Sequence, residues 1–296
     1  MISYRFMNMY MSGLTSGTHV ESKNDVFVKY LMAPEQMNMQ MHMLMGMYGI
    51  TNRLTAMLMF NYQFNSMDMT MYGSPHVHGA TMTSPEHSMK TSGLGDTKLH
   101  LLYGIIQRNT CQLLASLGTS IPTGDIYLKG NASDPTYPNT HYPYGMQLGS
   151  GTADLLPGIC YIFQKDKLAM SASVSGTYRA GYNSLGYKLG NENMASIWIA
   201  YKWLQLISSS FRLEGTDSQQ IKGHDPDVHY LTEPSANPAN YGGKRVNAYI
   251  GSSLHFKGVL SKNRLSIEYG VPLYQDLNGI QLRQKNLVNA SWSFSF

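Results

Sequence analysis

Methionine dominates the N-terminal third of this 296-residue chain, because 18 of its 21 methionines lie within residues 1–90. They recur at every second position, in the runs Met7–Met11, Met37–Met47, Met57–Met59 and Met67–Met71. A spacing of two places side chains on one face of a β-strand. Thioethers and imidazoles suit Cu(I), so one hypothesis is that these residues handle a soft metal. The alternative hypothesis is a flexible apolar filler that contacts lipid or lines a path for greasy ligands.

The elements that position these side chains are strands with one apolar and one polar face. The clearest is the C-terminal segment, in which an apolar set alternates with a polar set: Val288, Ala290, Trp292, Phe294 and Phe296 against Asn289, Ser291, Ser293 and Ser295. A period of two is the signature of a strand. A terminal phenylalanine on such a strand resembles the sorting signal of bacterial outer-membrane proteins. That resemblance implies a partner in the barrel-insertion machinery.

The same alternation predicts twelve strands, near 2–11, 35–48, 53–65, 96–107, 110–121, 152–163, 167–180, 192–203, 205–214, 244–257, 263–273 and 284–296. Short connections, near 49–52, 108–109, 164–166, 204 and 258–262, alternate with long ones, near 12–34, 66–95, 122–151, 181–191, 215–243 and 274–283. Outer-membrane barrels have short periplasmic turns and long extracellular loops. We therefore predict a single all-β domain, residues 1–296, that is a transmembrane antiparallel up-and-down β-barrel in the bacterial outer membrane, with both termini periplasmic.

Composition agrees with this class and argues against others. Only 14% of the residues are Asp, Glu, Lys or Arg, against roughly a quarter in soluble domains. The sequence contains no run of about 18 apolar residues, so it predicts no transmembrane helix. The net charge of +4 is too small and too dispersed to favour nucleic acid. The spacings typical of hydrolases, metalloproteases and phosphate-binding loops are missing, so we expect no enzyme.

The candidate metal ligands come from three predicted strands and one loop. In the first and third strands the residues that alternate with the methionines are mostly apolar or aromatic and take the lipid face. Met7, Met9, Met57 and Met59 are therefore expected to point into the barrel. On the second strand we expect His42 to face inward and Met39–Met47 outward, because an unpaired imidazole or amide in lipid is costly. The loop near 66–95 adds a His-x-His spacing. The predicted copper ligands are therefore Met7, Met9, His42, Met57, Met59, His76 and His78.

The other side chains expected in the lumen are polar and mostly cationic: Arg5, Asn61, Gln63, Lys98, His100, Lys202, Arg212, Arg245, Arg264 and Glu268. Two interpretations remain open. Opposite charges pair and plug a narrow barrel, or the excess of cations forms a constriction that favours anions. Twelve strands lie between the filled barrels of about eight strands and the open channels of about sixteen. The sequence therefore does not decide whether the lumen is open.

Five stretches resemble the meta-pathway phenol-degradation family of outer-membrane transporters: Met1–Met11, Met37–Tyr48, Ser120–Asp125, Tyr144–Leu156 and Gly270–Leu277. The resemblance implies a barrel that moves small, often hydrophobic compounds across the outer membrane. Our leading hypothesis is therefore an outer-membrane channel for small hydrophobic or aromatic solutes, with membrane lipid and the solute as its partners. The alternatives are a barrel that binds or transports copper and a structural or surface-interaction barrel.

Overall fold

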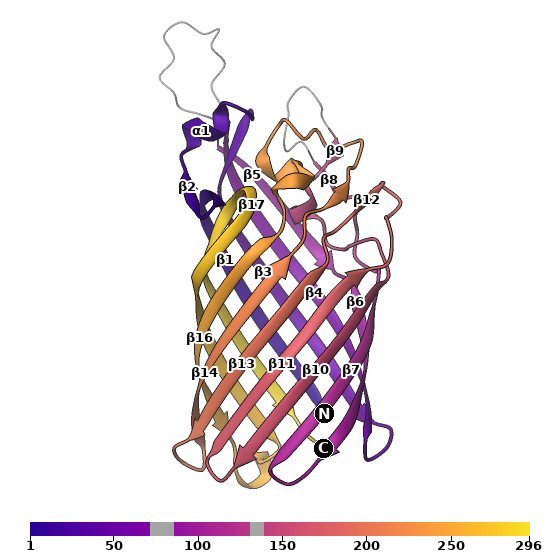
Figure 1. Cartoon of the computed structure of the whole chain (residues 1–296), viewed down its shortest axis with the longest axis vertical. Coiled ribbons are helices and arrows are strands. Elements are labelled where there is room, and N and C mark those ends of the chain that lie inside the picture. The colour runs from indigo at the N-terminus through magenta and orange to yellow at the C-terminus, as the bar shows by residue number, and fades with distance from the viewer. Residues whose placement is uncertain (72–85, 131–138) are drawn as a thin grey trace, which may run out of the picture.

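Eleven strand elements form the wall of a closed antiparallel β-barrel in the computed structural model, which describes residues 1–71, 86–130 and 139–296 (Figure 1). Consecutive wall elements pair with each other, and the first closes the wall against the last. Ten of them cross the wall once: β1 (Ile2–Gly17), β3 (Met32–Gly49), β4 (Leu54–Met71), β6 (Thr97–Gln107), β7 (Cys111–Ile121), β10 (Asp154–Lys165), β11 (Leu168–Arg179), β13 (Glu192–Lys202), β14 (Ile207–Ser218) and β16 (Gly243–His255). The predicted fold class is confirmed.

The eleventh element, β17 (Asn263–Phe294), crosses the wall twice. Its first half pairs with β16 and its second half with β1. Gly279 sits near the turn with a φ of 60°, a left-handed conformation that costs glycine little. The twelve predicted strands are therefore present as twelve crossings. The long connection expected near 274–283 is wrong, because β17 continues through this segment: Asp276 and Leu277 pair with β16, and residues 280–282 pair with β1. The Gln275 side chain also donates to the Gln284 carbonyl at 3.0 Å and accepts from the Gln284 amide at 2.9 Å.

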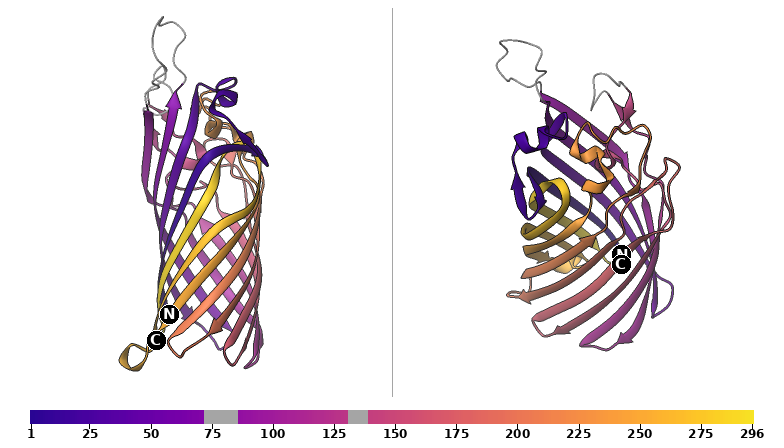
Figure 2. Two further views of the ribbon diagram at one scale, coloured as in Figure 1. Left: turned by 90° about the vertical axis from the view of Figure 1, so that its left-hand side faces the viewer. Right: turned by 45° about the horizontal axis from the view of Figure 1, so that its top comes forward.

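Most of the remaining elements gather at one end of the barrel, which we call the mouth (Figures 1 and 2). They are β2 (His19–Glu21), α1 (Lys23–Phe27), β5 (Glu86–Leu94), β8 (Lys129–Gly130), β9 (Thr140–His141), β12 (Tyr187–Lys188), β15 (Lys222–Gly223) and the 3₁₀ turns η1 (Tyr144–Met146), η2 (Pro234–Ala236) and η3 (Pro238–Asn240). Both chain ends lie at the opposite end, which we call the terminal end and which also holds η4 (Gly258–Leu260) (Figure 1). In the described part of the chain, no helix is long and apolar enough to span a membrane.

The outer face of the wall is apolar and aromatic. The side chains at alternate positions of β4, from Leu58 to Phe64, are 38–45% exposed. On the last crossing, Trp292 is 38% exposed, whereas the Ser291 hydroxyl meets that of Ser266 at 2.6 Å. The predicted outward and inward sets of the C-terminal strand are confirmed. Such a face suits a hydrocarbon environment, since alternate residues of a membrane barrel meet lipid and lumen.

His42 lies on this outer face, so the prediction that it points into the lumen is wrong. The register pairs His42 with Phe6 on one side and with Tyr62 on the other, and paired residues share a face. The cost expected for an outward imidazole is removed, because the Tyr4 hydroxyl and His42 Nδ1 form a hydrogen bond of 2.7 Å. Phe6 and Phe64 also pack against the imidazole, with ring centroids 5.2 and 5.6 Å away. Met39–Met47 are consequently turned inward rather than outward.

An arginine at adjacent positions of β3 should test this assignment of faces. Leu44 is 52% exposed on the outer face, and Met45 lies on the inner face opposite Met59. Leu44→Arg should lower the free energy of unfolding by about 2–4 kcal/mol, the cost of an arginine on the lipid face near the bilayer centre. Met45→Arg should cost much less. Urea unfolding in liposomes measures both, and an equal cost for the two variants would contradict the assignment.

Candidate functional site

Methionines cover the inner face of β1, β3 and β4. The register places them directly opposite one another in the pairs Met11–Met37, Met9–Met39, Met7–Met41, Met37–Met67, Met45–Met59 and Met47–Met57. We call this surface the methionine wall: Met7, Met9, Met11, Met37, Met39, Met41, Met43, Met45, Met47, Met57, Met59, Met67 and Met69. Paired side chains on neighbouring strands lie about 5 Å apart at Cβ. The wall therefore presents a nearly continuous thioether surface to the lumen.

Four of the predicted metal ligands share the inner face at different positions along the strands without converging, and a fifth lies on the outer face. Met7, Met9, Met57 and Met59 belong to the methionine wall, whereas His42 lies across the sheet from it. His76 and His78 lie outside the described residues. Two histidines pair with methionines of the wall: His100 with Met57 and His87 with Met69. Among the described residues, no group of three or more His, Cys, Asp or Glu side chains is arranged to hold a metal.

The other predicted lumen residues form a charged and polar surface, much of it paired. Arg212 forms ion pairs with Glu214 and Glu268, the latter at 2.8 Å. Its guanidinium also stacks 3.7 Å from the centre of the Tyr249 ring, and the Tyr249 hydroxyl donates to Glu214 at 3.0 Å. The interpretation in which opposite charges pair therefore holds for this part of the lumen.

The remaining lumen predictions divide by their surroundings. Lys98 and His100 line a shared cavity, and Arg264 donates to the Ser253 hydroxyl at 3.1 Å. Lys202 is exposed and pairs with Ser208 near the terminal end. Arg5 lies opposite Met43 and Ser291. These residues are spread over the lumen and do not converge on one site.

A segment that sequence reasoning did not single out as a site lies inside the mouth. We call residues 141–150 the plug, because they lie against the inner face of β4 and β5. Thr91 donates to the Met146 carbonyl at 2.8 Å, and Gln63 donates to the Leu148 carbonyl at 3.3 Å. Inside the plug, Met146 and Leu148 are 0% and 5% exposed. The only sequence signal was that the resemblance stretch Tyr144–Leu156 overlaps this segment.

Asp96 is the main anchor of the plug. This carboxylate is 9% exposed and accepts three hydrogen bonds from the loop between β7 and β10. Ser150 donates to Oδ2 from its backbone at 2.8 Å and from its hydroxyl at 2.7 Å, and the Gly124 amide donates to Oδ1 at 3.0 Å. Hydrogen bonds to a charged acceptor are about twice as strong as neutral ones. Asp96 thus ties both ends of the loop to the start of β6.

Three tyrosines join the plug to the loops that lie above it. The Tyr144 ring packs edge-on against Tyr187 and Tyr241, at centroid distances of 4.7 and 5.8 Å. Tyr241 accepts from the Gly145 amide at 3.0 Å and donates to the Ser235 carbonyl at 2.6 Å. Burial raises the pKa of Tyr144, Tyr187 and Tyr241 above the ordinary tyrosine value, so these hydroxyls stay protonated at neutral pH.

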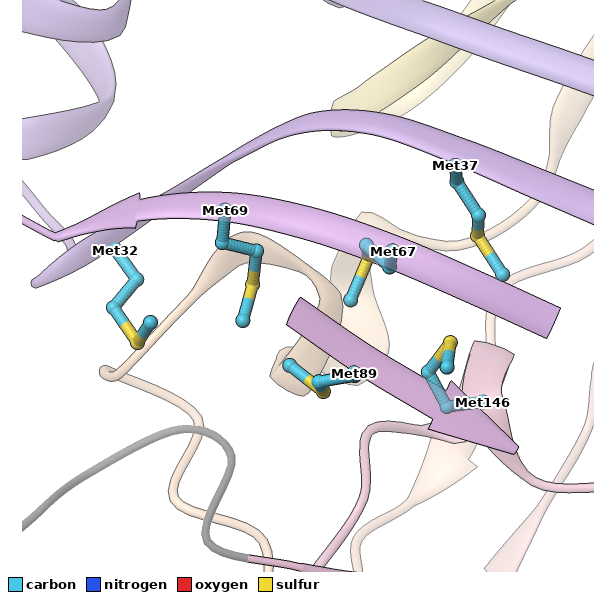
Figure 3. Packing of buried hydrophobic residues seen from close by; sticks show 6 residues of the cluster. All are labelled: Met32, Met37, Met67, Met69, Met89 and Met146. Carbon is cyan, nitrogen blue, oxygen red and sulfur yellow. The ribbon is translucent and has the colours of Figure 1, made fainter. Parts of the chain in front are cut away.

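Under the plug, six methionines form one buried cluster: Met32, Met37, Met67, Met69, Met89 and Met146 (Figure 3). They come from β3, β4, β5 and the plug. The cluster is buried, since none of the six side chains is more than 7% exposed. Methionine is flexible enough to fill such an irregular gap between a sheet and a loop.

Three cavities line the lumen. The mouth cavity, of about 260 Å³, is bounded by Met9, Met11, Met37, Met39 and Met67, by the plug, and by Tyr241, Arg245 and Gln281. A second cavity of about 250 Å³ and a third of about 230 Å³ share Lys98, Leu156, Thr177 and Glu192, so they adjoin each other further along the lumen. The lining of each cavity includes both methionine and polar side chains.

Arg245 is the polar feature of the mouth cavity. Its Nη2 donates to Gln281 Oε1 at 3.3 Å. Within the described residues it forms no ion pair, in contrast to Arg179 and Arg212. A guanidinium carries five donors and never loses its charge in proteins. The mouth cavity therefore combines an apolar, sulfur-rich surface with one cation that has spare donors.

The comparisons place the fold among outer-membrane barrels. No family model matches the chain, and no curated protein matches it. Among solved structures, an outer membrane channel from Pseudomonas putida F1 has 15% identity and a TM-score of 0.61, with coverage of 100% of this chain and 94% of that one. The transport unit of the autotransporter AIDA-I from Escherichia coli has 11% identity and a TM-score of 0.54, covering 100% and 90%.

A third solved structure, a deltaS2 mutant of the TodX monoaromatic hydrocarbon channel, has 11% identity and a TM-score of 0.51, with coverage of 100% of this chain and 89% of that one. At these identities the likeness concerns the fold alone. The chain has the fold of the bacterial outer-membrane β-barrels.

Proposed function

We propose that this protein is a channel of the bacterial outer membrane that passes small apolar or aromatic molecules. In this proposal the mouth faces the outside and both termini lie in the periplasm, as short turns at the terminal end and long connections at the mouth are typical of such barrels. The resemblance to the phenol-degradation transporters agrees with the proposal, and the closed apolar outer face suits a bilayer.

The observation that carries the proposal is the mouth cavity between the methionine wall and the plug. Small-molecule sites are concave and mostly apolar, with a few placed polar groups that orient the ligand. Methionine sulfur makes favourable contacts with aromatic rings, worth about 0.3–1.5 kcal/mol each. An aromatic ring fits against Met9, Met37 and Met39, and a polar substituent then reaches Arg245 and Gln281.

Arg245 sharpens the solute class to apolar molecules that carry an acidic group. A hydrogen bond between the guanidinium and an anion contributes about 1.5–3 kcal/mol to binding, after the hydrogen bonds to water that it replaces are subtracted. The next cavity along the lumen holds two further cations, Lys98 and Arg179, beside carboxylates that include Asp154. An anion that leaves the mouth cavity therefore meets polar partners on its way toward the terminal end.

Uptake by proteoliposomes tests the proposal. Benzenesulfonate stays anionic at neutral pH and crosses bare lipid slowly, so its entry reports on the protein. We expect protein-dependent entry of benzenesulfonate that is several-fold faster than that of gluconate, an anion without an apolar ring. Empty liposomes and liposomes with heat-unfolded protein are the controls. Equal entry of both anions would remove the aromatic preference, and no protein-dependent entry of either would remove the channel.

A further inference from the structure

The methionines of β1, β3 and β4 are confined to one face of the sheet. From Met7 to Met69, every methionine of these strands lies on the inner face, where the register pairs them with one another and with Asn65, Gln63 and Lys98 through β4 and β6. The outer face of the same strands uses leucine, phenylalanine and tyrosine instead, as at Leu44, Leu58 and Phe60. The thioethers of these strands are thus gathered on one surface inside the barrel.

Four thioethers come together where the wall meets the plug. Met37, Met67 and Met89 lie in one row, because Met67 pairs with Met37 on one side and with Met89 on the other. Met146 of the plug packs into the same buried cluster. Figure 3 shows Met37 and Met67 reaching from the strands toward Met89 and Met146. We call these four residues the mouth quartet; they are at most 7% exposed.

We propose that the mouth quartet is a binding site for a soft monovalent cation, Cu(I) or Ag(I). Thioether ligands select Cu(I), whereas harder divalent ions prefer imidazole, carboxylate or water. The quartet offers sulfur alone in a dry surrounding, and a single positive charge is cheaper to bury there than a double one. The site goes beyond passage of organic solutes and uses residues of the mouth rather than the separated set of Met57, Met59 and His42.

The position of the quartet gives the cation a consequence for the channel. Three ligands belong to the wall, and Met146 belongs to the plug that Asp96 anchors. A ligand that binds only the closed arrangement stabilises that arrangement by mass action. Bound Cu(I) or Ag(I) therefore holds the plug against β4 and β5 and keeps the mouth shut.

Titration of the folded full-length protein with Ag(I), under conditions without chloride, tests the site. We expect the wild-type protein to bind Ag(I) in competition with a thioether chelator. Met89→Leu with Met146→Leu should weaken that binding at least a hundredfold, because leucine fills a similar volume without sulfur. Met170→Leu, on the outer face of β11, is the matched control and should bind as the wild type does. Wild-type affinity in the double variant would overturn the proposal.

X-ray absorption of the Cu(I)-loaded wild-type protein gives a second test that does not depend on how the variants fold. Sulfur scatterers alone are expected, whereas nitrogen ligands would overturn the quartet and point to histidines elsewhere. Benzenesulfonate uptake separates this site from the proposed function. Wild-type protein that transports benzenesulfonate without binding Ag(I) overturns the metal site alone, and wild-type protein that binds Ag(I) without transporting benzenesulfonate overturns the proposed function alone.

Discussion

Asp96→Ala should turn a nearly closed barrel into an open pore, with a single-channel conductance in planar bilayers that is several-fold above that of the wild type. The substitution leaves three donors, the Ser150 amide and hydroxyl and the Gly124 amide, without their acceptor. A buried donor without a partner costs about 1–3 kcal/mol. Even the lower value for each donor shifts the plug equilibrium toward the open state by about a hundredfold, since 1.4 kcal/mol is a factor of ten.

Two further variants make the conductance result specific. Asp217→Ala removes a carboxylate from an exposed position of β14 and should leave conductance unchanged. Asp96→Asn keeps one acceptor oxygen and should fall between the wild type and Asp96→Ala. A conductance of Asp96→Ala equal to that of the wild type, in protein that runs as a folded barrel, would show that the plug does not limit passage.

Arg245→Gln should reduce the uptake of benzenesulfonate about tenfold or more, with little change for the neutral benzenesulfonamide. The reason is the loss of a charge-assisted hydrogen bond, worth about 1.5–3 kcal/mol, in a cavity where Arg245 forms no ion pair within the described residues. The glutamine retains hydrogen-bonding capacity toward Gln281, so the cavity keeps its shape. Proteoliposome uptake of the two solutes, measured side by side, gives the ratio.

Lys244→Gln is the matched control for this prediction. Lys244 is the exposed neighbour of Arg245 on β16, so the substitution removes the same charge from the opposite face of the strand. Its uptake ratio should equal that of the wild type. If Lys244→Gln lowers benzenesulfonate uptake as much as Arg245→Gln does, general surface charge rather than the mouth cavity sets the preference.

The wall of the barrel was predictable because each crossing repeats one simple pattern. A period of two, with lipid on one side, leaves little freedom in register, and the faces of the C-terminal strand follow from it directly. The connection near 274–283 was not predictable by this rule. Its glutamines are typical of a loop, and the segment is part of a strand because it pairs with β16 on one side and with β1 on the other.

The prediction of which face of β3 points into the lumen was wrong, for a physical reason that the sequence does not show. Polar and apolar positions alternate there too, but the cost of an outward imidazole depends on a partner from another strand. Tyr4 supplies that partner for His42, and its position on β1 beside β3 is known only once the register is known. Burial rules that treat one strand at a time therefore assigned the methionines of β3 to lipid.

The plug was beyond sequence reasoning for a similar cause. Asp96 and Ser150 are 54 residues apart, and neither belongs to a pattern that marks it as a site. Met146 stands alone in its segment, far from the methionine-rich third that it joins in space. The contacts of the plug depend on the inner surface of the barrel, and that surface is known only once the strands have been placed.

The flux of benzenesulfonate into proteoliposomes, with wild-type protein and Asp96→Ala compared at equal amounts of folded barrel, tests the central claim most directly. If the lumen is a channel that the plug restricts, the wild type gives slow, protein-dependent entry and Asp96→Ala gives entry several-fold faster. If neither protein admits benzenesulfonate above the rate of empty liposomes, the lumen is not a path across the membrane, and the account of this barrel as a channel is contradicted.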